Sequence, residues 1–271
     1  MWKECQVFRI RYDSDRACSK RLRTDQPQRL PGFRRFNLLL HGPCRRRDGL
    51  SGCRHRTSGG AVRIYEASFF LLSHLPVDHL LGLGMYPRLS QKEVEMTICV
   101  LSEDDHATHA LDSLYAPPYW PLKLEDCGGR LQILPHSFPF QIGEISISGL
   151  KGCHPGGVWC FRLEYRGKTL VYASVFEHEE PYFCDFIDFS RNADLILYDA
   201  QYTEEEYERE KGYGHSTAEK GMELLESSGA GQLLLIQHDP WNTAGQLLEH
   251  EAQIGKVNVL RYAREGEVIP V

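Results

Sequence analysis

Histidine and aspartate side chains follow an apolar segment in the first informative stretch of this 271-residue chain. The stretch is FFLLSHLPVDHLLGL, in which His74, Asp78 and His79 come shortly after the apolar run 69–72. Neutral imidazole nitrogen and carboxylate oxygen are ligands that suit zinc, manganese or iron(II). One histidine after a strand is more often an ordinary surface or core residue, so only repetition of the pattern is informative.

The pattern does recur, because polar groups of the same kind border five more elements expected from the sequence. They are His154 in GCHPGG, His178 in VFEH, Asp199 in YDAQYT, His215 in GYGHST, and His238 with Asp239 in QHDP. Hydrolytic metal sites are built when the strand ends of a rigid sheet bring such side chains together. Together these residues predict a metal-dependent hydrolytic site.

The elements that must position these residues are strands in the first part of the chain, and strands alternating with helices in the second. Alternating or continuous apolar runs predict strands, with a tight turn around Gly167 joining two of them. Two amphipathic segments predict helices, the first opened by Ser216 and Glu219 as a capping box and ended by Gly229. The expected strands are 95–101, 144–149, 158–165, 169–175, 194–198 and 232–236, and the expected helices are 217–229 and 243–255. Alternation of this kind predicts a layered α/β fold.

Composition narrows the class of protein. Hydrophobic residues at 42% and charged residues at 25% are ordinary for a soluble globular protein. No apolar run approaches the roughly 20 residues of a membrane helix, and MWKECQVFRIRYDSD lacks the features of a secretory signal. Nine cysteines occur without paired CxxC spacing, which argues against a disulfide framework or a structural zinc site. We therefore expect a cytoplasmic protein without membrane contact.

The N-terminal segment differs from the rest. Residues 1–66 hold 14 Arg and 2 Lys against 6 acidic residues, a net charge of +10 in a chain whose total is −6. Such an arm can bind nucleic acid or an anionic membrane. It shows neither helical nor strand periodicity, however, and a misread coding frame would give similar sequence. We expect residues 1–60 to be an atypical basic segment, with 14–60 adding little to the core, and residues 61–271 to form the functional domain.

The motifs resemble those of a known family. SHLPVDHLLGL resembles the His-x-His-x-Asp-His motif of the metallo-β-lactamase-fold hydrolases, with His74, Asp78 and His79 at its first, third and fourth positions. From there to the C-terminus, LYAPPYWPLKLED, CHPGGVWCFRLEYRGKTLVYAS, LILYDAQYTEEEY, GYGHST and LLLIQHDP follow in the family's order. The GHST segment is similar to that of the branch containing ribonuclease Z and cyclic phosphodiesterases. The resemblance implies an αββα sandwich, in which two β-sheets are flanked by helices.

The resemblance also implies a set of metal ligands, and three family positions are substituted. Pro76 replaces the second motif histidine, Val175 the bridging aspartate, and Gln237 the final histidine. One metal would keep His74 and His154. The other would keep Asp78 and His79, with His238 added if the chain shifts by one residue. We expect one divalent ion or none, rather than two, with zinc first and manganese or iron as alternatives.

The resemblance makes His215 the proton donor to the leaving oxygen of a phosphodiester, and Asp78 the second candidate catalytic residue. The competing interpretation is that GHST only begins a helix. Asp199 is expected to support the site without binding metal. Two functions stay open: a metal-dependent hydrolase of nucleotide or nucleic-acid phosphodiesters, acting as a possible homodimer, and a catalytically silent family member that binds a nucleotide or a protein partner.

Overall fold

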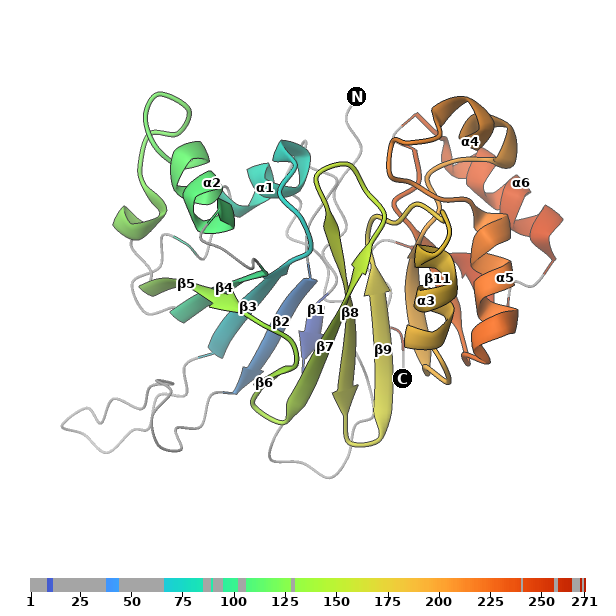
Figure 1. Ribbon diagram of the computed structural model, residues 1–271, viewed down its shortest axis with the longest axis horizontal. Helices are drawn as coiled ribbons and strands as arrows, with labels where there is room; N and C mark the ends of the chain where they lie inside the picture. Colours follow the sequence, from blue (N-terminus) through green and yellow to red (C-terminus); the bar gives the residue numbers. More distant parts are fainter. Residues whose placement is uncertain are drawn as a thin grey trace. The chain divides into compact units, whose positions relative to one another are not determined.

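The computed structural model describes residues 9–11, 38–43, 66–84, 89, 95–101, 106–127, 130–239, 241–255, 258–264, 269 and 271. The chain divides into two compact units, formed chiefly by Glu4–Ser137 and by Phe138–Glu265. Each unit contains one β-sheet and helices, shown in Figure 1. Two sheets with helices confirm the predicted α/β class.

The first unit holds a five-stranded sheet with the order β1-β2-β3-β4-β5. Only the β2–β3 pair is antiparallel, and the other neighbours are parallel. The elements of this unit are β1 (Arg9–Arg11), β2 (Leu38–Pro43), β3 (Glu66–Leu72), α1 (Val77–Gly84), β4 (Glu95–Leu101), α2 (His106–Leu114), the 3₁₀ turn η2 (Leu124–Asp126) and β5 (Arg130–His136). Strand β4 matches its predicted bounds.

The core of the first unit follows from side-chain periodicity. Alternate residues of β3 and β4, such as Phe70 and Ile98, point to one face of the sheet and are buried there. Leu80 and Leu83 of α1 lie three residues apart, on one face of that helix, and belong to the same cluster. Tyr115 packs among them and donates a hydrogen bond to the carbonyl oxygen of Leu80. This bond ties the end of α2 to the helix that carries Asp78 and His79.

The second unit holds a seven-stranded sheet with the order β12-β11-β10-β9-β8-β7-β6. Strands β6 to β9 pair antiparallel, whereas β9 to β12 pair parallel because helices connect them. The elements are β6 (Phe140–Ile142), β7 (Ile145–Gly152), β8 (Val158–Tyr165), β9 (Lys168–Ala173), α3 (Tyr182–Phe189), β10 (Leu195–Asp199), α4 (Glu204–Glu210), α5 (Ala218–Ser228), β11 (Leu233–Ile236), α6 (Ala244–Ile254) and β12 (Leu260–Tyr262).

The predicted hairpin is confirmed. Arg166 and Gly167 both have positive φ, +49° and +75°, as a two-residue turn between antiparallel strands requires. The second strand of the hairpin ends at Ala173, two residues earlier than predicted. Val175 therefore lies beyond the strand, although it is fully buried. The segment that follows β9 is thus part of the interior.

Both predicted helices of the second unit form, but the cap of α5 differs from the prediction. Thr217, not Ser216, is the N-cap, and its side chain accepts a hydrogen bond from the Lys220 backbone N–H at 3.2 Å. Ser216 is fully buried and its hydroxyl has other partners, so it is not available as a cap. Gly229 ends the helix in the left-handed region, as predicted. Helices α3 and α4 were not expected from the sequence.

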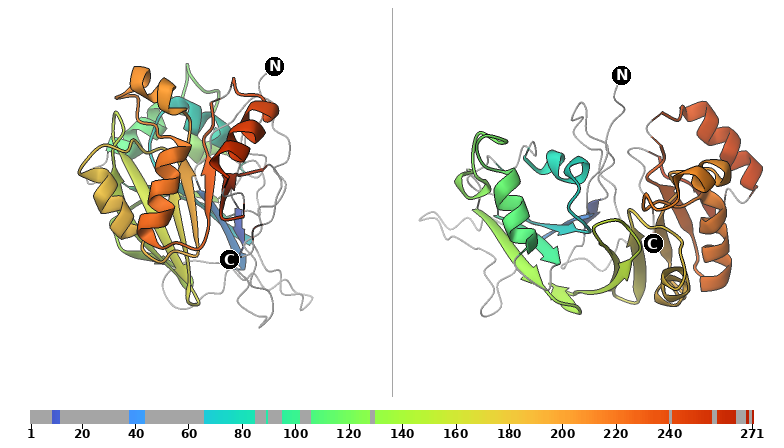
Figure 2. Two further views of the ribbon diagram at one scale, coloured as in Figure 1. Left: turned by 90° about the vertical axis from the view of Figure 1, so that its right-hand side faces the viewer. Right: turned by 45° about the horizontal axis from the view of Figure 1, so that its top comes forward.

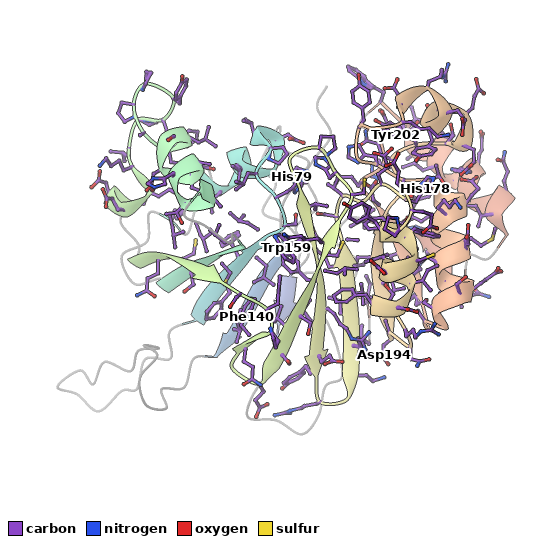
Figure 3. All side chains as sticks on the ribbon, in the orientation of Figure 1. His79, Phe140, Trp159, His178, Asp194 and Tyr202 are labelled. Carbon is purple, nitrogen blue, oxygen red and sulfur yellow. The ribbon has the colours of Figure 1, made fainter. Side chains whose placement is uncertain are left out.

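Helix α5 lies against the parallel strands, as both views of Figure 2 show, and apolar side chains pack between them. Leu224 of α5 is buried with Leu233 and Leu235 of β11 in one cluster. A separate aromatic group lies at the antiparallel end of the sheet, where Phe138 contacts Phe140 and Trp159 at ring-centroid distances of 5.7 and 5.1 Å (Figure 3). The strands are therefore anchored at both ends of the sheet.

Two short parts of the basic N-terminal segment are paired in the first sheet. Residues 38–43 form β2, which pairs with β3, so this part of the range 14–60 belongs to the first sheet. Strand β1 pairs with β2 in turn. The remainder of 14–60 lies outside the described residues. No described helix is long and apolar enough to cross a membrane.

Candidate functional site

Strand β10 ends in a buried carboxylate that holds a histidine. Asp199 is fully buried, and its Oδ2 lies 2.8 Å from Nδ1 of His215. The same carboxylate accepts the backbone N–H of Phe176 at 3.0 Å and that of Gln201 at 3.1 Å. A carboxylate that accepts two N–H groups is well placed to accept a third, so Nδ1 of His215 is the donor in this pair. This bond fixes the tautomer and the orientation of the imidazole.

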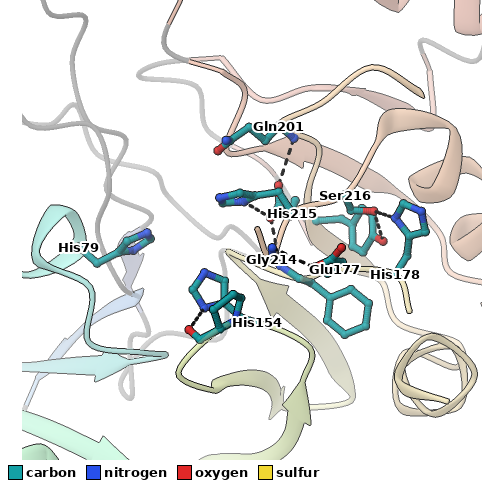
Figure 4. A network of polar contacts seen from close by, with 12 residues as sticks. His79, His154, Glu177, His178, Gln201, Gly214, His215 and Ser216 are labelled. Atoms are coloured by element: carbon teal, nitrogen blue, oxygen red, sulfur yellow. Dashed lines mark hydrogen bonds and ion pairs between the residues drawn. The ribbon is translucent and has the colours of Figure 1, made fainter. Parts of the chain in front are cut away.

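His215 occupies the loop between α4 and α5, where it is 7% exposed. Its ring meets the ring of Tyr202 edge-on, with centroids 5.6 Å apart. Its centroid is 6.1 Å from that of the His154 ring, which Figure 4 shows beside it. Because Nδ1 is committed to Asp199, Nε2 is the nitrogen that can exchange a proton with a bound molecule. Both residues were named from the sequence, Asp199 as a residue that supports the site, and in the structure Asp199 is the residue that orients His215.

His154 lies in the turn between β7 and β8. Its Nδ1 is 2.7 Å from the Pro155 carbonyl oxygen, which can only accept, so Nδ1 carries the proton. Neutral imidazole then has its lone pair on Nε2, which is the tautomer that a metal ligand or a proton acceptor needs. The structure thus places two oriented imidazoles, those of His154 and His215, side by side within the second unit.

A serine–histidine contact next to this pair resembles a nucleophile with its base. Ser216 Oγ lies 2.8 Å from Nδ1 of His178 and 2.7 Å from the Tyr198 hydroxyl. Ser216 is fully buried, however, and burial lowers the pKa of His178 to about 4, with Lys220 as a further cause. The ring of His178 also packs on that of Tyr207 at 4.1 Å. These contacts make Ser216 a structural link between α5 and the sheet, not a nucleophile.

His238 follows β11 at the position considered for a shifted metal ligand. Gln237 between them has a positive φ of +61°, which is uncommon outside glycine and turns the chain sharply after the strand. The ring of His238 then meets the ring of Tyr262 edge-on, with centroids 6.5 Å apart. This contact places the His238 ring next to Tyr262 of β12.

The first unit brings together the motif residues that survive in the sequence. Ser73 Oγ lies 2.9 Å from Nδ1 of His74, and the His74 and His79 ring centroids are 4.1 Å apart. Asp78 Oδ2 is 3.7 Å from Nε2 of His79. Both histidines are buried, whereas Asp78 is about half exposed. These side chains come from the end of β3 and the first turn of α1.

Pro76 has a structural explanation in this segment. It immediately precedes α1, and its carbonyl oxygen accepts the His79 backbone N–H at 3.0 Å. Proline is tolerated at a helix start because the missing N–H would have no partner within the helix there. The substitution therefore removes a ligand position of the family while preserving the helix that carries Asp78 and His79.

A metal centre needs several donor side chains close together. Among the residues that the structure describes, no group of three or more His, Cys, Asp or Glu side chains is arranged to hold a metal ion. Cys153, beside His154, does not offer a thiolate, because burial and nearby Glu179 raise its pKa to about 11. Val175 and Pro76 contribute no donor atom.

The β-lactamase superfamily domain model matches residues 58–238, which is more than half of the chain. The chain belongs to this superfamily, whose metallo-β-lactamase fold accounts for the two sheets and the helices described above. The predicted family is thereby confirmed.

Three relatives illustrate the similarity. A curated Bacillus subtilis protein, "Probable metallo-hydrolase YhfI", is 29% identical over 128 residues, which cover 45% of this chain and about half (49%) of that protein. The YhfI crystal structure matches with a TM-score of 0.56 and 19% identity over 76% of this chain and 87% of that chain. The crystal structure of human tRNase Z, short form, matches with a TM-score of 0.51 and 14% identity, over 80% of this chain and 90% of that chain. The crystal structure of unliganded yeast PDE1 matches with a TM-score of 0.56 and 15% identity, over 75% of this chain and 68% of that chain.

Proposed function

We propose that this protein hydrolyses phosphodiesters of the nucleotide or nucleic-acid type, with His215 as the proton donor to the leaving oxygen. The observation that carries the proposal is the 2.8 Å bond between Nδ1 of His215 and the fully buried Asp199. Departure of an alkoxide from phosphorus needs a proton in the transition state, and a positioned imidazole supplies it. The names of human tRNase Z and yeast PDE1 are consistent with this substrate class.

The carboxylate of Asp199 has two physical roles in this proposal. It holds the imidazole so that Nε2 is the atom that meets the leaving group, and it stabilises the imidazolium before the proton is transferred. Its own position is fixed by the backbone N–H groups of Phe176 and Gln201. A proton donor held in this way has less freedom to lose when the substrate binds.

The name of the metallo-hydrolase YhfI indicates a bound metal. We propose that this chain also binds a metal, as a divalent ion. The candidate ligands are His74, Asp78, His79, His154 and His238. Zinc is expected first, with manganese or iron as alternatives, and the substituted positions favour one ion or none over two. A bound metal would supply an activated water, and Asp78 is the carboxylate candidate beside it. Elemental analysis of the purified protein measures the metal content directly.

The experiment that tests the proposal compares the parent chain with His215→Ala on bis(p-nitrophenyl) phosphate. A lost general acid lowers kcat by about 10²- to 10⁴-fold. Thr217 still caps α5 in this variant, so the helix is retained. His109→Ala is the matched control, since His109 is an exposed histidine on α2. Equal kcat in the parent and in His215→Ala would leave the GHST segment with a structural role alone.

A second function is favoured by one observation at the substituted position. Val175, where the family has its bridging aspartate, is fully buried and packs as an interior side chain. A catalytically silent protein that binds a nucleotide or a protein partner would tolerate this change. Calorimetric titration with a nucleoside monophosphate discriminates the two: binding without turnover, in the presence of zinc or manganese, supports the silent protein. A homodimer and a cytoplasmic location stay proposals, the first testable by analytical ultracentrifugation.

A further inference from the structure

We propose that Glu177 is a positioning residue that sets the placement of His154 and His215 relative to each other. Glu177 is 1% exposed, and its carboxylate contacts the loop that leads into His215. Oε1 accepts the Gly212 backbone N–H at 2.6 Å, and Oε2 accepts the Gly214 backbone N–H at 2.9 Å. Both carboxylate oxygens are thus used to hold the residues just before His215, as Figure 4 shows for Gly214.

The backbone of the same residue holds the segment that carries His154. Glu177 forms an isolated antiparallel bridge with Cys153, in which its N–H donates to the Cys153 carbonyl oxygen at 2.9 Å. Cys153 is the direct neighbour of His154. One residue therefore fixes the chain on both sides: its backbone holds the turn after β7, and its side chain holds the loop before α5.

Gly214 is the point at which the two segments touch. A Cβ atom built on Gly214 would lie 2.1 Å from Cδ2 of His154, a distance that only the absence of a side chain permits. Gly214 also has a φ of +90°, which favours glycine. The N–H that Glu177 accepts thus belongs to the residue that rests on the His154 ring and precedes His215. Loosening this bond moves the contact between the two histidine segments.

The carboxylate of Glu177 has a third neighbour in Tyr207 of α4. Burial raises the pKa of Tyr207 above its ordinary range, and the charge of Glu177 and a hydrogen bond to it add to the increase. The phenol therefore stays protonated and can donate to the carboxylate. This network links α4, the loop and the segment after β9 through a single side chain. The expected catalytic consequence of this network rests on the proposed function, whereas its positional consequence does not.

Glu177→Gln tests the role, because an amide offers one acceptor oxygen where the loop presents two N–H groups. Its NH₂ group would face one of these backbone donors, so at least one bond is lost. In protein labelled with ¹⁵N-glycine, the Gly212 and Gly214 amide resonances should move upfield. The nuclear Overhauser effect between the Gly214 Hα and the His154 ring should weaken by at least about twofold. In an active parent, kcat should fall by roughly 10- to 100-fold with little change in KM, as misplacement of a catalytic group predicts.

Glu251→Gln is the matched control. Glu251 is also a buried carboxylate of the second unit, and it accepts the Tyr262 backbone N–H at 2.9 Å and a bond from Arg264 at 3.0 Å. This variant should leave the Gly214–His154 signal and kcat unchanged. Glu177→Asp keeps the charge but shortens the side chain, so it should give intermediate values. If Glu177→Gln does not fold, the same measurements are made on Glu177→Asp.

Three results overturn the positioning role: unchanged glycine resonances in Glu177→Gln, an equal loss of the signal in Glu251→Gln, or unchanged kcat when the resonances have moved. An inactive parent chain is a different outcome. It would contradict the proposed phosphodiesterase function, while the resonance comparison alone would still support or overturn the placement of His154 and His215 by Glu177.

Discussion

Asp199 and His215 are joined by a 2.8 Å hydrogen bond that connects the last residue of β10 to the loop before α5. The residues are 16 positions apart in the sequence, and both are buried. The carboxylate is in turn held by two backbone N–H groups, one of them from the segment after β9. The imidazole of His215 is thus oriented by an element that lies well before it in the chain.

Asp199→Asn should lower kcat on a generic phosphodiester by roughly 10²- to 10⁴-fold, because an amide no longer stabilises the imidazolium or selects the tautomer. Asp194→Asn is the matched control, since Asp194 also accepts a backbone N–H, that of Thr169, but pairs with Lys168. Steady-state kinetics of the parent and both variants measure the effect. Comparable losses in the two variants would contradict a special role for Asp199.

Gly214→Ala should destabilise the protein by roughly 1–3 kcal/mol more than Gly167→Ala does, because it adds a clash to the backbone strain. Both glycines have positive φ, but a Cβ at Gly167 meets nothing within 4 Å, whereas one at Gly214 meets the His154 ring. Urea unfolding of the two variants gives the difference in the free energy of unfolding. Equal losses would show that the His154 ring moves aside without cost.

Restoring the substituted family positions should rebuild a metal centre. The parent chain should hold at most one divalent ion, whereas the triple variant Pro76→His, Val175→Asp, Gln237→His should hold two, measured by elemental analysis after dialysis. The gain should exceed the sum of the single changes, because the ligands act together. Two tightly bound ions in the parent would refute this prediction, as would a folded triple variant that binds metal no better.

Val175→Asp alone should destabilise the protein when no metal is bound. Val175 is fully buried, so an unpaired carboxylate there should lower the free energy of unfolding by roughly 2–4 kcal/mol. Zinc should restore part of this loss in the triple variant, since a ligand that binds only the folded state stabilises it. Denaturant unfolding with and without zinc measures both effects. An unchanged stability of the single variant would mean that the new side chain reaches water.

The pair His250–Glu219 should make stability depend on pH. Nε2 of His250 lies 3.0 Å from Glu219 Oε1, and this hydrogen bond raises the pKa of His250 and lowers that of Glu219. A raised histidine pKa adds stability that is complete below the ordinary value of 6.5 and disappears as pH rises through the folded-state pKa. A lowered carboxyl pKa adds stability above the ordinary value of 4.5 that disappears at lower pH.

The contribution of this one interaction should therefore be greatest between about pH 4.5 and 6.5 and smaller at pH 8.5. The destabilisation by His250→Gln, measured by urea unfolding at pH 5.5 and 8.5, should shrink at the higher pH. Glu219→Gln should show the same trend, because it breaks the same bond. A destabilisation that is equal at both pH values in either variant would show that the bond involves neutral His250.

The sequence by itself determined several of the elements and the class of fold. Local patterns suffice for these: alternation predicted β4, a tight turn around Gly167 predicted the hairpin, and Gly229 predicted the end of α5. The family was predicted from the motif residues that survive, which are His74, Asp78, His79, His154 and the GHST segment. The sequence also located the substitutions at Pro76, Val175 and Gln237, since these are identities at fixed positions in a motif.

The tertiary structure decided how those residues are held. Ser216 looked like a helix cap, yet Tyr198 and His178 bind its hydroxyl, and Thr217 takes the cap. Glu177 showed no motif at all, because its two N–H partners come from residues 35 and 37 positions later. Hydrogen bonds between distant segments leave no periodic trace in a sequence, so only the folded chain reveals which carboxylate orients which histidine.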